Sequence, residues 1–314
     1  MTRSGLFEGL VATAPVIMTG GSTYERFRRR TDVVSDPQIA HAALVYDEAG
    51  ASLLASATKE YIDVAQTAGL PMLVGTPTWR ASHGRVERSA FRGRRVNQDC
   101  VAFSRSIVDE YRADDGSPIV IGGSLGPAGD AYRPDEGLGI AEAERLHSVQ
   151  AEALAEGGVD LLMSMTHPAI DEARGMARAL EATALPYVIS FVVREAGTLL
   201  DGTPLDEAMD RIDQETRRAP VGYFINCVHP TILEGALTRS APLATERLLG
   251  FRANTAAKSP EELDRAEELI TGTPEVLAGE LATLHQTRGL KILGGCCGTS
   301  TEHMEALAES LTNS

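Results

Sequence analysis

The sequence predicts an α/β protein, a single (β/α)8 barrel that spans residues 1–314. Short apolar runs recur along the chain, and helical patterns separate them. Strands that are buried on both faces read as nearly continuous apolar runs, so this alternation is typical of a parallel sheet. Eight such units favour a closed barrel over an open sheet, and 314 residues is an ordinary length for one. The predicted strands cover residues 14–21, 70–77, 119–123, 159–166, 187–193, 223–228, 248–254 and 290–294.

The segment between the first two predicted strands is longer than a simple crossover needs. Residues 37–69 carry a helical pattern, which we expect to break near Ala49 and Gly50. We therefore interpret residues 52–69 as an extra helical insertion. It could form a lid or a subunit contact, but we favour a solvated surface addition, because loops and helix ends tolerate these readily.

The second half of the chain repeats the same unit with clearer boundaries. Residues 141–150 carry a helical pattern between the third and fourth strands. Ser300 precedes another helical pattern and is expected to cap it. No low-complexity linker divides the chain, which favours one domain.

The composition favours a water-soluble enzyme. Lys and Arg total 29 against 44 Asp and Glu, which gives a formal net charge of −15 and argues against nucleic acid and anionic membrane surfaces as partners. The sequence has no apolar run near 18 residues and no signal-peptide pattern at its first residues, so we expect a cytoplasmic protein without a membrane span. A homo-oligomer remains open.

Two adjacent thiols are the most informative local feature. Cys296 and Cys297 lie in the run Gly294-Gly295-Cys296-Cys297-Gly298-Thr299, directly after the last apolar strand. Neighbouring cysteines make a strained disulfide, because bridging them distorts the peptide between them. They can, however, both point at one soft metal ion, and Zn²⁺ is the usual ion held by thiolates.

A third thiol ends another apolar run. Cys227 follows the strand pattern of residues 223–226, whereas Cys100 lies in the helical pattern of residues 97–103 and is interpreted as a small buried hydrophobe. Strands six and eight are two apart in a barrel, so their carboxyl ends lie near each other. Cys227, Cys296 and Cys297 are therefore the predicted catalytic metal ligands, a three-ligand zinc site with one open position.

Active sites of this fold lie at the carboxyl ends of the strands. We expect the residues that follow these ends to line one mouth with the thiols. The candidate substrate-binding residues are Thr19, Gly20, Gly21, Trp79, Arg80, Met165, Asn226 and Asn254.

The two thiol motifs resemble those of a known family. Asn226-Cys227 and residues 294–299 are similar to the zinc motifs of the homocysteine S-methyltransferase family, which includes S-methylmethionine- and betaine-dependent enzymes. Weaker similarities occur, in the expected order, at residues 126–132, 202–205 and 253–255. The resemblance implies methyl transfer from a small donor of the S-methylmethionine, S-adenosylmethionine or betaine type. The acceptor would be a zinc-bound thiolate, that of homocysteine or a related thiol or selenol.

This chemistry agrees with the predicted ligand set. Most of a free thiol is protonated at neutral pH, and zinc would bind it as the more nucleophilic thiolate. A cationic methyl donor would be stabilised by an aromatic face. Trp79 could supply that face or could only pack at the rim, and we hold these two roles equal. Arg80 is the better candidate for a substrate anion than the Arg-rich segment 85–95, which we interpret as a solvated loop.

Two residues depart from the family pattern. Relatives usually end the first strand with Asp-Gly-Gly or Asp-Gly-Ala and the fourth with Glu-Thr-x-Pro, and these carboxylates are associated with the amino group of homocysteine. Here Thr19 and Met165 stand at those places. A hydroxyl and a thioether cannot balance an ammonium charge. We therefore predict an acceptor other than ordinary homocysteine.

Other functions remain open. A zinc-dependent lyase or hydrolase on the same barrel would need a general base near the metal. A non-catalytic zinc or thiol sensor would use Cys296 and Cys297 as a redox pair. His167 and His229 each precede a proline and are interpreted as residues bonded locally rather than as ligands. The glycines form no dinucleotide fingerprint.

Overall fold

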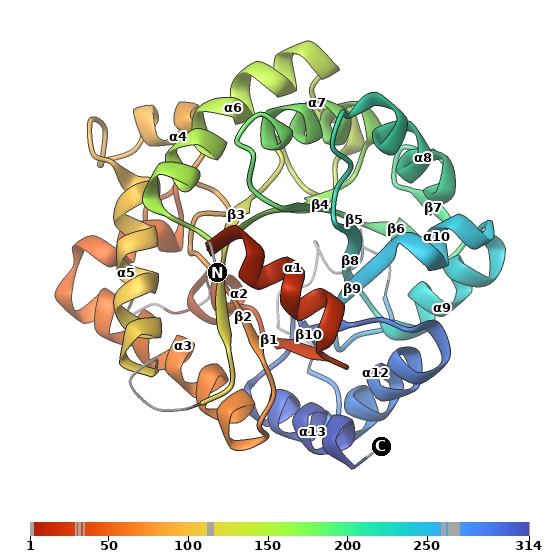
Figure 1. Ribbon diagram of the computed structural model, residues 1–314. Helices are drawn as coiled ribbons and strands as arrows, with labels where there is room; N and C mark the ends of the chain where they lie inside the picture. Colours follow the sequence, from red (N-terminus) through yellow and green to blue (C-terminus); the bar gives the residue numbers. More distant parts are fainter. Residues whose placement is uncertain are drawn as a thin grey trace.

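The computed structural model describes residues 3–28, 30, 33, 35–111, 116–258, 262 and 271–313. Its main sheet is a closed barrel of parallel strands in the order β1-β10-β9-β8-β5-β4-β3-β2 (Figure 1), which confirms the predicted (β/α)8 barrel. The barrel strands are β1 (Ile17–Thr19), β2 (Met72–Gly75), β3 (Ile119–Leu125), β4 (Leu161–His167), β5 (Tyr187–Phe191), β8 (Gly222–Val228), β9 (Leu248–Ala253) and β10 (Ile292–Gly295).

Each barrel strand overlaps one of the predicted apolar runs. One small sheet was not predicted: β6 (Val193–Arg194) pairs antiparallel with β7 (Thr198–Leu199) directly after β5. Strands of two residues are too short to produce an alternating pattern in the sequence. This hairpin leads the chain from the barrel rim towards the next helix.

Helices surround the barrel on the outside. The longer ones are α3 (Glu48–Thr67), α5 (Val96–Tyr111), α6 (Ile140–Gly157), α7 (Ile170–Glu181), α8 (Leu205–Glu215), α9 (Pro230–Arg239), α12 (Pro274–Arg288) and α13 (Thr301–Thr312). The remaining helical segments are α1 (Arg3–Thr13), α2 (Thr23–Arg28), η1 (His41–Tyr46), α4 (His83–Arg88), η2 (Pro134–Glu136) and α10 (Pro242–Arg247). Ser300 precedes α13 and joins a capping box with His303, as the sequence predicted.

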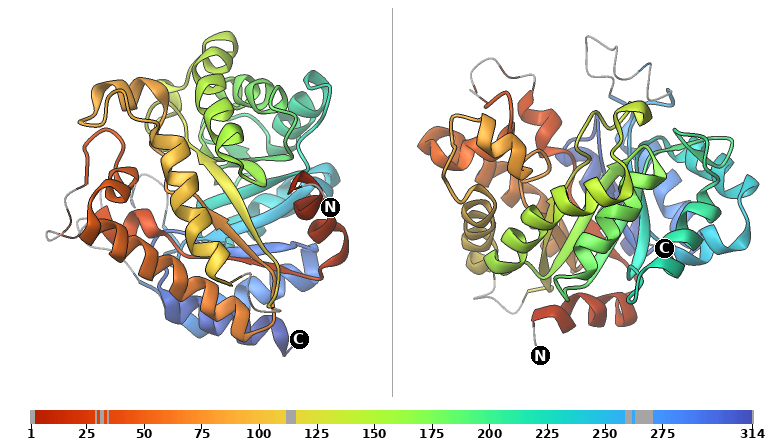
Figure 2. Two further views of the ribbon diagram at one scale, coloured as in Figure 1. Left: turned by 60° about the vertical axis from the view of Figure 1, so that its left-hand side comes forward. Right: turned by 90° about the horizontal axis from the view of Figure 1, so that it is seen from above.

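The first helix closes one end of the barrel. Figure 1 shows α1 crossing in front of the strands, and the right-hand view of Figure 2 shows it beneath them. Phe7 and Leu10 of α1 belong to the same buried cluster as Val120, Leu161 and Phe224. The amino ends of the strands are therefore covered, which leaves the carboxyl ends as the open face.

The predicted insertion at residues 52–69 is corrected by the structure. The helix α3 runs without a break and packs between α13 and α5, so it is the outer helix of the first βα unit. Gly50 does not break it, because its N–H lies in the first turn and donates to the capping carboxylate of Asp47 at 2.7 Å. The extra helical structure between β1 and β2 is instead α2 and η1.

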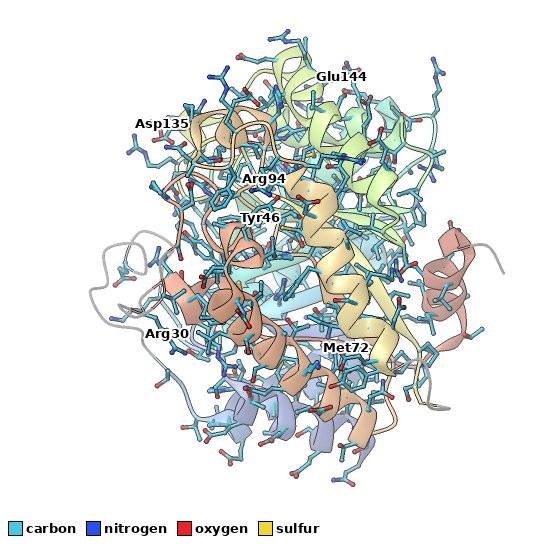
Figure 3. All side chains as sticks on the ribbon, turned by 90° about the vertical axis from the view of Figure 1, so that its left-hand side faces the viewer. Arg30, Tyr46, Met72, Arg94, Asp135 and Glu144 are labelled. Atoms are coloured by element: carbon cyan, nitrogen blue, oxygen red, sulfur yellow. The ribbon has the colours of Figure 1, made fainter. Side chains whose placement is uncertain are left out.

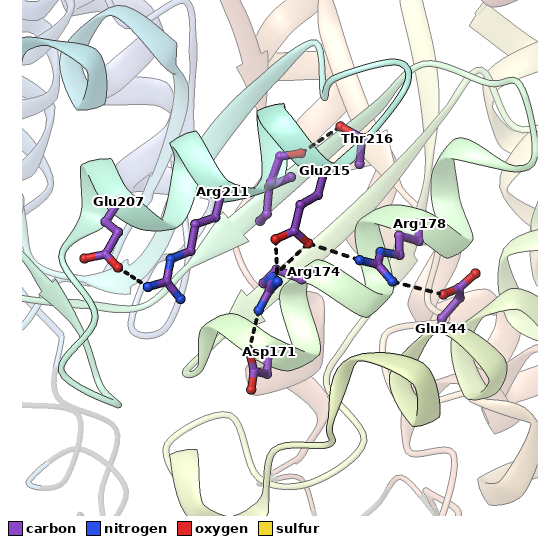
Figure 4. Close-up of polar contacts among 9 residues, drawn as sticks. Glu144, Asp171, Arg174, Arg178, Glu207, Arg211, Glu215 and Thr216 are labelled. Carbon is purple, nitrogen blue, oxygen red and sulfur yellow. Dashed lines mark hydrogen bonds and ion pairs between the residues drawn. The ribbon is translucent and has the colours of Figure 1, made fainter.

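Ion pairs connect three of the outer helices. Arg174 of α7 bonds to Asp171, one turn away, and to Glu215 of α8 (Figure 4). Arg178 joins Glu215 at 3.2 Å and Glu144 of α6 at 3.8 Å. Because these groups are partly exposed, each pair contributes little to stability, and the buried apolar contacts between α6 and α7 matter more.

Candidate metal and substrate site

Three thiols meet at the open end of the barrel. Cys227 lies near the end of β8, and Cys296 and Cys297 follow β10, with β9 between these two strands. Their sulfur atoms all lie within 4.8 Å of one another, and the Cys227 and Cys296 sulfurs are 2.8 Å apart. Cys227 and Cys296 are buried, and Cys297 is half-buried. The structure thus brings together the three residues that the sequence proposed as ligands.

The backbone at Cys227 is strained in a way that serves this arrangement. Its φ is 61°, in the left-handed region that residues other than glycine rarely adopt. The pairing of β8 with β9 shifts register between Asn226 and Val228, on either side of this residue. Such strain costs about 1–3 kcal/mol and is typical of functional sites, where the surrounding structure enforces it. Thr166, near the end of β4, has a similar φ of 71°.

Two asparagines hold the thiol loops in place. Asn226 donates to the Cys227 sulfur at 3.1 Å and to the Thr166 hydroxyl at 2.7 Å. Asn254 donates to the Cys227 carbonyl at 2.8 Å and accepts from the Cys297 N–H at 3.0 Å. It thereby ties one thiol-bearing loop to the other.

The position of Asn254 changes the role that the sequence predicted for it. Its side chain is 1% exposed, and among the described residues it is not part of the pocket lining. Both ends of its amide are bonded to the cysteine backbone. We therefore correct its assignment from substrate contact to positioning of the thiols.

The three thiols share their protons unequally. A hydrogen bond from Cys227, with a further one from Cys297, holds the pKa of Cys296 well below its usual range. The hydrogen bond to Cys296 raises the pKa of Cys227, and bonds to Cys227 and Cys296 raise that of Cys297. Thiolates rather than thiols bind metals, so a metal ion here would displace the remaining protons.

The thiols form one side of a pocket of about 220 Å³. Most of the predicted substrate-binding residues line it: Thr19, Gly20, Gly21, Trp79, Arg80, Met165 and Asn226. Glycine is required at Gly20, because a Cβ there would lie 2.7 Å from the Tyr61 ring. The size suits a small molecule rather than a polymer.

Several lining residues were missed by the sequence analysis: Tyr24, Arg28, Asp130, Tyr132 and Arg252. Arg252 left a signal, since it is a charged residue inside the otherwise apolar run 248–254. Tyr132 lies in a loop that had been noted only for its family resemblance. Tyr24 and Arg28 lie in α2, whose short pattern could not be distinguished from a loop.

Trp79 both packs at the rim and lines the pocket. Its ring contacts Tyr24 edge to face at 5.4 Å between centroids, and its Nε1 donates to the Met165 carbonyl at 3.4 Å. The guanidinium of Arg80 lies 5.4 Å from the Trp79 ring centroid. The rim-packing role of Trp79 is therefore present, and its contact with a methyl donor stays a prediction.

The Arg-rich segment 85–95 lies away from the pocket. Among the described residues, it contributes none of the lining. Arg85 donates to the Ala128 carbonyl at 3.2 Å, and Figure 3 shows Arg94 beside Tyr46, with its guanidinium 5.2 Å from the ring centroid. Burial lowers the pKa of Arg85 to about 10. The segment therefore packs against its neighbours, and only part of it is the solvated loop that we predicted.

Neither predicted local histidine belongs to the thiol group. His229 caps α9 by accepting from the Thr231 N–H at 3.3 Å, as expected for a residue at a helix start. His167 is fully buried and bonds to Ser164. Burial lowers the pKa of His167 to about 4, so its ring is neutral at pH 7.

The donor set fits a soft metal ion. Cys227, Cys296 and Cys297 all line the pocket as well as facing one another. An ion held by them would keep one side towards the pocket, which is the arrangement of a catalytic rather than a structural thiolate site. The Asn226 amide supplies the hydrogen bond to a ligand sulfur that commonly supports such sites.

Fold and site together define a barrel protein with three thiols at its open end that could hold a metal ion. The chain belongs to the homocysteine S-methyltransferase family, whose sequence model matches residues 16–311. In the residues that the structure describes, no helix is both long and apolar enough to cross a membrane.

Individual relatives are distant. Homocysteine S-methyltransferase YbgG of Bacillus subtilis is 26% identical over 210 residues, which cover 64% of each chain. Selenocysteine Se-methyltransferase of Brassica oleracea is 22% identical over 95% of this chain and 89% of its own length. The metallated form of the homocysteine methyltransferase MmuM of Escherichia coli superposes with a TM-score of 0.76 at 21% identity, covering 96% of this chain and 99% of that one. This last similarity supports the fold.

Proposed function

We propose that this protein is a zinc-dependent methyltransferase that moves a methyl group from a small donor to a thiol or selenol acceptor. The observation that carries the proposal is the group of three thiols within 4.8 Å of one another on the pocket wall. Membership of the homocysteine S-methyltransferase family supports the reaction class. The names of the relatives, which include a selenocysteine Se-methyltransferase, support an acceptor that differs between members.

Zinc held by three thiolates would supply an open position at which a substrate thiol loses its proton and stays electron-rich. The residues of the chain orient this chemistry. Asn226 fixes the Cys227 sulfur, and Asn254 fixes the backbone on both sides of the thiol group. Because the sulfurs lie on the wall of a pocket, the surrounding side chains would shield the reacting acceptor from part of the bulk water.

The donor that we propose is a sulfonium or quaternary ammonium compound of the S-methylmethionine, S-adenosylmethionine or betaine type. Such a donor loses its positive charge on transfer, and aromatic faces stabilise it before that step. Tyr24, Trp79 and Tyr132 supply aromatic surface to the pocket. Burial and the three neighbouring thiols raise the pKa of Tyr132, so this side chain lies close to the thiols.

The acceptor that we propose is not ordinary homocysteine. Thr19 and Met165 line the pocket at the two places where the family resemblance implies carboxylates. Neither side chain can balance an ammonium charge, and an unpaired charge in a narrow pocket is costly.

The test is a methyl-transfer assay with reduced, zinc-loaded protein and a panel of small thiols, read by mass spectrometry, with S-methylmethionine, S-adenosylmethionine and betaine tried in turn as donors. We expect methylated thiol from the native chain and none from Cys297→Ala. Cys100→Ala is the matched control, because Cys100 is fully buried but lies outside the thiol group. Retained zinc without methylation of any thiol by any of the three donor types would contradict the proposal and favour a sensor.

A further inference from the structure

One arginine of the pocket projects across the end of a neighbouring strand. Arg252 lies on β9, in register with Gly294 of β10. Its Nε donates to the Gly295 carbonyl at 3.2 Å, and its Nη2 donates to the carbonyls of Gly20 at 3.2 Å and Gly21 at 3.3 Å. The guanidinium therefore lies above β10 and beside the residues that follow Thr19.

Among the described residues, Arg252 donates to backbone carbonyls and bonds to no carboxylate. The pocket lining contains two carboxylates, and their bonds go to other groups. Glu25 forms an ion pair with Arg28 at 3.1 Å, and Asp130 accepts from the Tyr132 N–H at 2.7 Å. Carbonyl dipoles orient a guanidinium but bring no formal negative charge, so Arg252 can also bind an anion in the pocket.

Two strand ends at the pocket offer no partner for a cationic group. Thr19 is the side chain that lines the pocket where β1 ends, and it is neutral. Met165 lines the pocket at the end of β4 and is neutral too. An ammonium group beside Arg252 would meet a like charge and no carboxylate, whereas a carboxylate would gain charge-assisted hydrogen bonds.

The thiol group is within reach of a small ligand held at Arg252. Cys296 follows Gly295, the last residue of β10, whose carbonyl accepts a hydrogen bond from Arg252. The pocket that joins them has a volume of about 220 Å³. The thiols and Arg252 both line this pocket, so a small ligand can lie between them.

We propose that Arg252 anchors a carboxylate of the acceptor, and that the acceptor is a short mercaptocarboxylate without an amino group, of the 4-mercaptobutanoate class. This inference rests on the proposed thiol methylation, and it names the acceptor that the same site selects. Arg80 is the competing anchor, because it also lines the pocket and its hydrogen bond goes to the Gly129 carbonyl.

Thioethers test the anchor without requiring turnover. We would titrate zinc-loaded protein with 4-(methylsulfanyl)butanoate, L-methionine and 3-(methylsulfanyl)propan-1-amine, using calorimetry and the fluorescence of Trp79, the single tryptophan of the chain. The first ligand carries only a carboxylate, the second carries a carboxylate and an ammonium, and the third carries only an ammonium. The butanoate should bind most tightly and the amine least. L-Methionine binding as tightly as the butanoate would overturn the inference.

Two variants locate the anchor. Arg252→Gln should weaken binding of the butanoate about 10- to 100-fold, the effect of losing hydrogen bonds to a charged group. Arg252→Lys should recover part of it, and Arg80→Gln should change it less than about threefold. An effect of Arg80→Gln that exceeds that of Arg252→Gln would move the anchor to Arg80 and contradict the proposal.

Thr19→Asp tests the same charge argument without removing Arg252, so misfolding of Arg252→Gln would not affect its result. Thr19→Asp keeps Arg252 and its carbonyl contacts but places a carboxylate beside it. This variant should bind the butanoate more weakly and L-methionine more tightly than the native chain. Unchanged selectivity in Thr19→Asp, in protein that retains its zinc, would contradict the charge argument.

Methyl transfer to the corresponding thiols separates this inference from the proposed function. Faster methylation of 4-mercaptobutanoate than of L-homocysteine supports both. Faster methylation of L-homocysteine supports the function and overturns the acceptor. If no thiol is methylated but the thioether preference holds, the anion anchor is supported and the methyl transfer is overturned.

Discussion

The two sides of the pocket mouth are built on different principles. On the side formed by β8, β9 and β10, backbone and amide hydrogen bonds fix every thiol, and Cys227 even adopts a strained φ of 61°. On the side formed by β1, β2 and β4, the lining side chains Thr19, Trp79 and Met165 bring no carboxylate. In the proposed function, the first side would hold the metal ion and, through Arg252 of β9, the carboxylate of the acceptor. The second side would offer no partner for an ammonium group.

The largest effect that this comparison predicts concerns the thiols themselves. Cys296→Ala should abolish stoichiometric zinc binding, because the two remaining thiols cannot form a three-ligand site. Metal content per chain, measured by mass spectrometry after dialysis, tests this. Cys100→Ala should retain zinc, and a Cys296→Ala protein that still holds one zinc ion per chain would show that the metal lies elsewhere.

Two buried histidines outside the thiol group should make the folded protein less stable in acid. Burial lowers the pKa values of His41, which lines the pocket, and His167, which ends β4, from 6.5 to about 4. The unfolded chain therefore binds more protons than the folded chain between these values. Stability is full above about pH 6.5 and falls as the pH drops towards 4, by about 3 kcal/mol for each histidine.

The free energy of unfolding in urea, measured at pH 7.5 and pH 4.5, tests whether stability falls as the pH drops. His41→Gln should lessen the loss of stability between the two pH values, since glutamine does not titrate. Exposed His83 supplies the control, and His83→Gln should leave the difference unchanged. An equal pH dependence in native protein and His41→Gln would contradict the assignment of a neutral buried ring.

A smaller effect is expected from the residue that joins the two thiol loops. Asn254→Ala removes the bonds to Cys227 O and Cys297 N, and should lower zinc affinity about 10- to 100-fold, the usual cost of losing an outer-shell partner. Competition with a chromogenic chelator measures this.

Asn97→Ala is the matched control for Asn254→Ala. Asn97 is also buried and donates to a backbone carbonyl, that of Ala81. Its loss should reduce stability without changing zinc affinity. If both variants lower the zinc affinity equally, general packing and not Asn254 positions the thiols.

The thiols of this site could be predicted from the sequence more fully than the residues that would bind the acceptor. The thiols follow strong apolar runs and carry a rare spacing, so both their place and their convergence could be predicted from Cys227 and Cys296. The role of Arg252 could not be predicted from the sequence, because it depends on a side chain that crosses β10 to reach the carbonyls of Gly20 and Gly21. Contacts between residues that far apart in sequence leave no local pattern.

The fold shows the same division between local and distant information. The eight barrel strands were predicted from apolar runs alone. The role of α1 as a cover for the barrel was missed, because it depends on the contacts of Phe7 and Leu10 in the folded protein and not on their spacing in the sequence. The helix break predicted near Gly50 lies at Asp47, between η1 and α3, because Gly50 is tolerated in the first helical turn, where Asp47 caps it.

The most direct test of a three-thiol zinc site with an open position is X-ray absorption at the zinc edge, with and without 4-mercaptobutanoate. We expect three sulfur neighbours at about 2.3 Å in the protein alone and four after the thiol is added. A site that already has four protein ligands, and does not change on adding any thiol, would contradict the assignment of this pocket as the place of methyl transfer.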